Sequence, residues 1–184
     1  MPRAGLSTES VVQAAAELAD AEGLQAATLA ALAARLGVRP PSLYAHVEGV
    51  EDLRERIALR GIRQLGEAMQ LAAAGRAGHE ALAAIARAYR SYAHEHPGCY
   101  AALQRSRSPE AQAAAARVVE VVLAVLAGYG LEGEDALHAV RAIRAALHGF
   151  VSLEAAHGFG LPLPVDESFS RMVAMLDRAL AVAA

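Results

Sequence analysis

The stretch TLAALAARLGVRPPSLYAH, residues 28–46, decides how this sequence folds. Thr28 is a natural N-cap, and the apolar residues after it recur at the helical spacing i, i+3, i+4 and i+7. Gly37 suits the left-handed conformation that ends a helix, and Pro40 suits a first helical turn, where its missing N–H needs no partner. The stretch therefore predicts two short helices around a tight turn, the second running from about Pro40 to about His46.

The second helix is short enough for its faces to be assigned. We expect Leu43 and Val47 to face inward, which leaves hydroxyls, an aromatic ring and an imidazole outside. Such groups suit contacts with phosphates and base edges in a major groove of DNA. A helical hairpin without any DNA-binding role has the same spacing and is the alternative at this point. The candidate DNA-contacting residues are Thr28, Arg39, Pro40, Ser42, Tyr44 and His46.

Two segments resemble a known family. LSTESVVQAAAELADAEGL and LGVRPPSLYAHVEG are similar, in order and spacing, to the first helix and the recognition element of the tetracycline-repressor (TetR) family of bacterial regulators. The resemblance covers residues 6–60. It implies a cytoplasmic DNA-binding transcriptional regulator, most often a repressor, with a three-helix DNA-binding domain over 1–49 and a helical ligand-binding and dimerisation domain over 50–184. The implied partners are a palindromic double-stranded DNA operator, a small-molecule inducer and a second copy of the chain.

The reading region departs from this family in its charge. Members commonly carry a lysine at the start of the fourth helix, where this sequence has Val50 followed by Glu51 and Asp52. Residues 1–60 hold six arginines and eight acidic residues, although Arg3 on the N-terminal arm is available for a groove or a phosphate. Because a non-specific DNA binder would be basic, a helical dimeric adaptor or ligand-binding protein with weak or lost DNA binding is the alternative function.

Composition limits the fold class. Of 184 residues, 55% are hydrophobic, 46 are alanine and all 17 basic residues are arginine, which favours helix throughout. We therefore predict an all-α fold of about nine helices. A single cysteine, Cys99, excludes an intrachain disulfide and a cysteine-rich zinc site and fits a reducing cytoplasm. We find no charged leader and no apolar run of about 18 residues, so we expect no membrane contact.

Beyond residue 50 the spacing of apolar residues and of Gly and Pro predicts six helices. The last of them is expected to begin with Asp166 as its N-cap. The preceding helix has two usable faces, one for its own domain and one for a partner subunit. The six helices are expected at about 50–73, 79–95, 100–104, 108–127, 133–157 and 166–182.

The segment LHGFVSLEAAHGFGLPLPVDESF resembles the C-terminal domain subtype of TetR-like regulators marked by a Trp/Leu-His-Gly signature. This resemblance implies that two C-terminal domains pair as a four-helix bundle and that each encloses an inducer pocket. Polar or aromatic side chains on core-facing stripes are the candidates for ligand contact, although each can equally be satisfied within the protein. These candidates are Tyr89, Tyr92, His96, Tyr100, Arg144 and His148. The candidate interface residues are Phe150, Leu153, Phe169, Met172, Val173, Leu176 and Leu180.

An enzymatic function finds no support in the sequence. Helical di-metal sites need paired Glu-x-x-His ligands, which are absent, and the adjacent residues His94, Glu95 and His96 point in different directions on a helix. The sequence also has no Gly-rich phosphate loop and no nucleophile elbow. We therefore expect no catalytic residues, no metal site and no cofactor.

Overall fold

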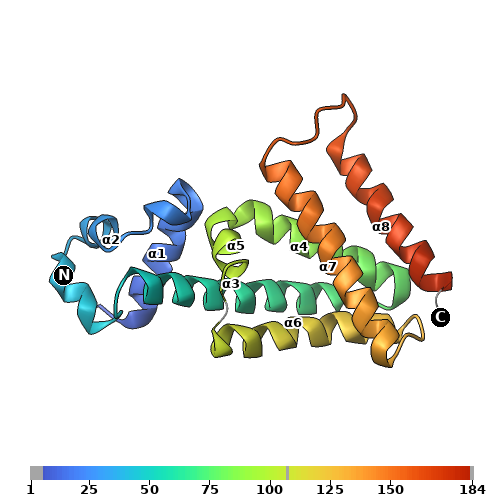
Figure 1. Cartoon of the computed structure of the whole chain (residues 1–184), viewed down its shortest axis with the longest axis horizontal. Coiled ribbons are helices and arrows are strands. Elements are labelled where there is room, and N and C mark those ends of the chain that lie inside the picture. The colour runs from blue at the N-terminus through green and yellow to red at the C-terminus, as the bar shows by residue number, and fades with distance from the viewer. Residues whose placement is uncertain (1–5, 107, 183–184) are drawn as a thin grey trace. The chain divides into compact units, whose positions relative to one another are not determined.

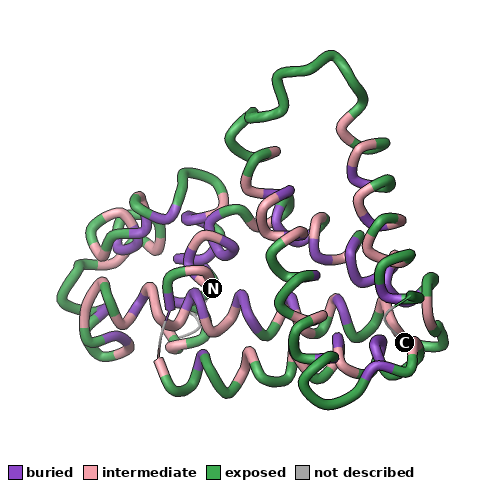
Figure 2. The backbone as a smooth tube through the Cα atoms, turned by 45° about the vertical axis from the view of Figure 1, so that its right-hand side comes forward, coloured by how far each residue is buried: buried purple, intermediate pink, exposed green. Residues whose placement is uncertain are grey.

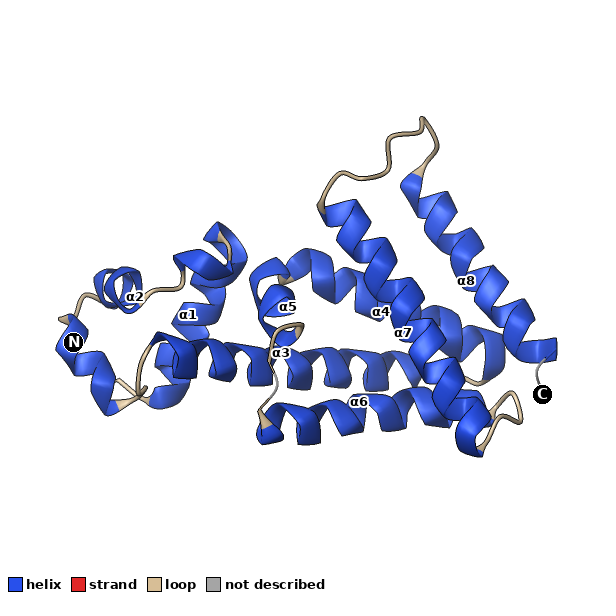
Figure 3. Ribbon diagram, viewed as in Figure 1, coloured by secondary structure: helices blue, strands red, loops and turns tan. Residues whose placement is uncertain are grey.

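The computed structural model describes residues 6–106 and 108–182, so Arg3 lies outside the described residues. Within them the chain forms eight α-helices and two short 3-10 helices and no strand, which confirms the all-α class (Figure 3). None of the described helices is both long enough and apolar enough to cross a membrane. The helices are α1 (Thr8–Glu22), η1 (Leu24–Ala26), α2 (Leu29–Leu36), η2 (Pro40–Ala45), α3 (Val50–Ala73), α4 (Gly78–Glu95), α5 (Pro97–Leu103), α6 (Pro109–Ala127), α7 (Gly133–Ala155) and α8 (Val165–Val182).

The chain folds into two compact units, and neither is continuous in sequence. The first comprises Met1–Arg63 and Glu95–Ala114, and the second comprises Gln64–His94 and Ala115–Ala184. The first unit thus holds α1, α2, both 3-10 helices, all of α5 and the beginnings of α3 and α6. This division differs from the predicted boundary after residue 49, because α5 packs with α1 although more than 70 residues separate them.

The contact between α1 and α5 is very close. A Cβ atom built on Gly98 would lie 2.1 Å from the backbone carbon and oxygen of Ala19, so only glycine fits there. The carboxylate of Asp20 in α1 accepts a 2.8 Å hydrogen bond from the Cys99 N–H and lies 2.9 Å from His96 Nδ1. Asp20 therefore caps the first turn of α5, which begins at Pro97 rather than at the predicted position near residue 100.

In the second unit α7 and α8 form a helical hairpin (Figure 1). We call residues 156–164, which connect the two helices, the strap. The other end of α8 is held by Asp177, whose carboxylate accepts a 2.6 Å hydrogen bond from Tyr129 Oη and lies 3.2 Å from His79 Nδ1. Burial, together with this bond to Asp177, raises the pKa of Tyr129 well above its usual value.

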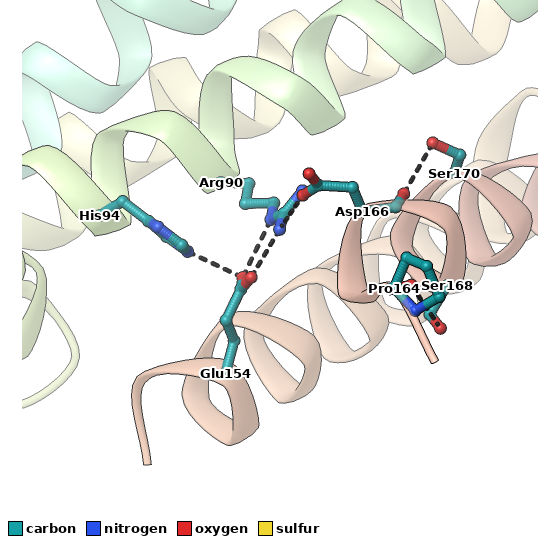
Figure 4. Close-up of polar contacts among 7 residues, drawn as sticks. All are labelled: Arg90, His94, Glu154, Pro164, Asp166, Ser168 and Ser170. Atoms are coloured by element: carbon teal, nitrogen blue, oxygen red, sulfur yellow. Dashed lines mark hydrogen bonds and ion pairs between the residues drawn. The ribbon is translucent and has the colours of Figure 1, made fainter. Parts of the chain in front are cut away.

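Arg90 of α4 lies where α7 ends and α8 begins (Figure 4). Its Nη2 lies 2.5 Å from Glu154 Oε1 and 2.7 Å from Asp166 Oδ1, and His94 Nε2 lies 2.7 Å from Glu154 Oε2. The predicted N-cap role of Asp166 is wrong, because α8 begins one residue earlier and the carboxylate bonds to Arg90 instead. The hydrogen bonds from Arg90 and, less strongly, from His94 lower the pKa of Glu154, although burial opposes the shift.

Candidate nucleic-acid interface

The turn between α2 and η2 forms as its residue types predict. Thr28 Oγ1 accepts a 3.2 Å hydrogen bond from the Ala31 N–H and so caps α2. At the other end of α2, Gly37 adopts a left-handed φ of 68°, which a side chain would make costly. The Val38 N–H then bonds to the Ala33 carbonyl at 3.0 Å, which closes the helix end and redirects the chain.

The second helix of the motif forms at Pro40–Ala45, where it was predicted, and it is a 3-10 helix, η2. Its hydrogen bonds include Ser42 N to the Arg39 carbonyl at 2.9 Å, an i to i−3 bond. The physical reason is the pair Pro40–Pro41. A residue before proline is disfavoured in the α conformation, and Pro40, the first residue of η2, precedes Pro41. Arg39 before Pro40 is extended at ψ 143° and so lies outside the helix.

The faces of η2 are those expected from the sequence except at His46, whose imidazole was expected outside. Leu43 and Val47 are buried, with 0% and 2% exposure, and fix the helix to the core of the first unit. Tyr44 is 60% exposed, and Arg39, Pro40 and Ser42 are also exposed. His46 is half-buried, and its Nδ1 lies 3.5 Å from Thr8 Oγ1 of α1. A guanidinium, a hydroxyl and a phenol are thus exposed along η2 and at its N-cap.

Three arginines of this unit, Arg35, Arg54 and Arg56, are paired with carboxylates. Arg35 contacts Glu17 at 3.1 Å, and Arg54 contacts Glu51 at 2.7 Å. Hydrogen bonds from Gln13 and then from Arg35 lower the pKa of Glu17. No ion pair is found for Arg39 within the described part of the chain, which leaves its guanidinium exposed beside η2.

Asp52 organises the beginning of α3. Its carboxylate accepts hydrogen bonds of 2.9 Å from the Glu48 N–H and from Arg56 Nε. Burial acts to raise the pKa of Asp52, but these two hydrogen bonds outweigh it and lower the pKa. Val50 is half-buried. A carboxylate of the chain therefore occupies the α3 N-terminus, as is favoured for acidic residues in a first helical turn.

The predicted ligand-contacting residues do not come together in one unit. His96 and Tyr100 belong to the first unit, where His96 contacts Asp20. Tyr89 and Tyr92 are buried in the second unit, and Tyr92 Oη donates a 3.3 Å hydrogen bond to Gln64 Oε1. Also in the second unit, Arg144 is exposed, and His148 is half-buried with its Nδ1 3.4 Å from Ser152 Oγ.

The predicted interface residues divide between core and surface. Leu153 is 50% exposed, and Met172 and Leu176 are half-buried. Four others are buried within the single chain, because the stripe that was assigned to a partner packs into the second unit's own core: Phe150, Phe169, Val173 and Leu180. Met175, which the sequence reading omitted, is 61% exposed on the outward side of α8.

Comparisons with known proteins agree with this architecture. Residues 11–57 match the family model described as bacterial regulatory proteins, tetR family. Residues 82–176 match the model described as tetracyclin repressor-like, C-terminal domain. An uncharacterized HTH-type transcriptional regulator of Mycobacterium tuberculosis is 43% identical over 177 residues, covering 94% of this chain and 81% of the relative. The chain belongs to the TetR family and is a DNA-binding transcriptional regulator; this is a family of regulators, not of enzymes.

Solved structures share the fold at lower sequence identity. A protein of unknown function from Rhodococcus sp. RHA1 has a TM-score of 0.83 and 23% identity, covering 98% of this chain and 99% of that chain. A TetR variant from Acinetobacter baumannii in complex with minocycline has a TM-score of 0.73 and 22% identity, covering 95% and 96%. These two likenesses establish the arrangement of helices and nothing about a ligand of this chain.

Proposed function

We propose that this regulator is a homodimeric repressor that binds a palindromic operator through the outward surface of η2 and leaves it when a small molecule binds. The main support for this DNA-binding surface is the difference in burial between two adjacent residues. Leu43 is fully buried, whereas Tyr44 is 60% exposed, and Arg39 and Ser42 of the same segment are exposed as well. Tyr44 and His46 then contact phosphates while Arg39 and Ser42 read base edges, with Thr28 and Pro40 at the margins.

The proposed dimer is supported by where apolar side chains are exposed. Among the described residues nine large hydrophobic side chains are exposed, and seven of them lie on α7, the strap and α8; the other two are Tyr44 and Leu71. Such concentration on one hairpin is typical of an interface, because exposed apolar residues on a monomer are usually scattered. The proposed helical interface comprises Leu137, Leu153, Met172, Met175 and Leu176. A two-fold dimer presents two identical reading surfaces and binds two half-sites about 34 to 36 Å apart. The proposed operator is therefore palindromic.

A small-molecule site in the second unit is the proposed trigger. The structural neighbour from Acinetobacter baumannii holds minocycline, which supports a ligand role for this fold. Tyr89 and Tyr92 are buried polar side chains of that unit, and His148 lies on α7 in the sequence pattern of the Trp/Leu-His-Gly subtype. His96, Tyr100 and Arg144 are the less central candidates, since two belong to the first unit and Arg144 is exposed.

One observation favours the second candidate function, a helical dimeric adaptor without DNA binding. The carboxylates of Glu17, Glu51 and Asp52 form ion pairs with three arginines that could otherwise contact phosphates. DNA affinity then depends on few contacts. In either case the protein acts in the cytoplasm, where its proposed partners are found.

Fluorescence anisotropy separates the two candidates. The probe is a labelled duplex from the region upstream of the protein's own gene, titrated with wild type, Arg39→Ala, Tyr44→Ala and, as a charge-matched control, Arg87→Ala. Arg87 is exposed on α4 in the second unit. We expect Arg39→Ala and Tyr44→Ala to weaken binding by about 1 to 3 kcal/mol each and the control to bind as wild type.

The results against the proposal are equally clear. Unchanged affinity in both η2 variants would place the DNA contact elsewhere on the molecule. A folded wild-type dimer that binds neither this duplex nor shorter overlapping fragments of the same region would favour the adaptor.

A further inference from the structure

The strap between α7 and α8 is apolar and exposed. The connection between the two helices is coloured as exposed along its length in Figure 2. Leu161 is 76% exposed, Leu163 is 66% exposed and Phe159 is 37% exposed. The sequence from 155 to 165, AAHGFGLPLPV, carries no acidic residue and no arginine. A surface loop of a monomer is normally polar, so two exposed leucines on either side of Pro162 require a physical explanation.

Both ends of the strap are fixed to α4 by Arg90 (Figure 4). On the α7 side, Glu154 accepts hydrogen bonds from Arg90 Nε at 2.9 Å and from Nη2, and on the α8 side Asp166 accepts one at 2.7 Å. The Arg90 Cζ atom also lies 4.8 Å from the ring centre of Phe169 and 5.8 Å from that of Phe150. Stacking on aromatic faces adds to the ion pairs in holding the guanidinium in place.

Within the strap the first residues are also ordered by contacts. The ring of Phe159 packs on Phe150 at 4.8 Å between centroids, and the Gly158 N–H bonds to the Leu153 carbonyl at 2.7 Å. Pro162 and Pro164 restrict the backbone dihedral φ on either side of Leu163. The strap is therefore held at both ends and stiffened in the middle, with its leucines directed outward, and a pre-organised segment of this kind loses little entropy on binding.

We propose that the strap is an arm that binds a second copy of this chain and buries Leu161 and Leu163 against the partner's apolar hairpin surface. The proposal rests on the dimer proposed above and adds to its helical interface a contact that α7 and α8 do not make. The strap joins the end of α7 to the beginning of α8, the two helices that carry the exposed Leu153 and Met175, so it is continuous in sequence with the proposed interface. A two-fold dimer uses the same surface on both copies, so a second copy offers an apolar face to match an uncharged arm.

The chain contains no tryptophan, so one introduced tryptophan reports on the strap alone. We would measure the emission maximum of Leu161→Trp and its quenching by acrylamide during dilution, with sedimentation equilibrium on the same samples. Leu71→Trp is the matched control, because Leu71 is 75% exposed on α3 and lies outside the strap. The combined variant Leu161→Trp with Met175→Glu reports the strap when the helical interface is disrupted.

The expected result is a blue-shifted, poorly quenched emission from Leu161→Trp in the dimer that becomes solvent-like as the dimer dissociates. The control stays solvent-like throughout, and the Met175→Glu background gives a monomer with solvent-like emission. A double variant Leu161→Asp with Leu163→Asp should raise the dimer dissociation constant about a hundredfold, and Leu71→Asp should leave it unchanged.

The failures are distinguishable. A dimer in which the Leu161→Trp emission stays solvent-like overturns the arm and leaves the proposed dimer intact. Emission that is buried at every dilution places the strap against its own protomer, and burial only on addition of phospholipid vesicles assigns it to a membrane; either overturns the arm. A chain that remains monomeric at high concentration overturns the dimer and the arm together.

Discussion

Replacing Gly98 by alanine tests the contact between α1 and α5. The new Cβ would lie 2.1 Å from the Ala19 backbone, which is 1.3 Å short of the 3.4 Å at which ordinary contact begins. Because the obstacle is backbone, α5 has to retreat by about that amount. The 2.8 Å hydrogen bond from the Cys99 N–H to Asp20 would then exceed hydrogen-bonding distance.

The magnitude follows from three contributions. Overpacking costs about 1 to 3 kcal/mol, and loss of the helix cap costs about 1 kcal/mol. Alanine in place of glycine returns up to about 1 kcal/mol, since it lowers the entropy of the unfolded chain and favours helix. The free energy of unfolding should therefore fall by about 2 kcal/mol.

Urea unfolding followed by circular dichroism measures this change. Gly149→Ala is the matched control, because Gly149 lies within α7 and a Cβ there meets nothing within 4 Å in the chain. We expect the control to be as stable as wild type or slightly more stable. If Gly98→Ala unfolds at the wild-type urea concentration or above it, the close α1–α5 contact is not a feature of the protein in solution.

Two further changes test the electrostatics. Val50→Lys should tighten DNA binding and steepen its salt dependence by about one counterion per subunit, as measured by anisotropy at several salt concentrations; an unchanged slope would mean that the α3 N-terminus lies away from the phosphates. In the second unit, the pKa of Glu154 is lower in the folded state than its ordinary value of 4.5. The ionised Glu154 therefore contributes its full stabilisation above about pH 4.5, and this stabilisation is lost as the pH falls through the pKa of the folded state. Wild type should therefore lose stability on acidification more steeply than Glu154→Gln in urea titrations at pH 3 to 6 (about the range of carboxyl titration), and parallel curves would contradict the Arg90 pairing.

Local signals in the sequence predicted most of the helices. Both ends of α3 were predicted at Val50 and Ala73, because helix periodicity, a carboxylate-rich first turn and a following glycine act over a few residues. The turn at Gly37 was also predicted from a local signal, a glycine directly after the last apolar residue of a helix. The 3-10 form of η2 also has a local cause, the two consecutive prolines, but the prediction weighed only the permissive effect of proline in a first turn.

Contacts between distant residues could not be predicted in this way. Arg90 meets Glu154 and Asp166 across 64 and 76 residues, and no pattern within one helix indicates such pairing. The same limit explains the interface residues. Phe169 and Met175 are both apolar residues on α8, and periodicity alone cannot decide which of two apolar faces packs within the chain and which faces a partner.

The membership of α5 in the first unit has a consequence for protein engineering. Hybrid sensors are commonly built by joining the DNA-reading part of one regulator to the sensing part of another, and a junction near residue 49 would keep α1 while discarding the segment that Asp20 caps. A transferable reading module of this protein is discontinuous: it needs residues 95–114 as well as the N-terminal segment through Arg63. Functional chimaeras should therefore exchange the two pieces as a set, with Ala19, Asp20 and Gly98 always taken from the same parent.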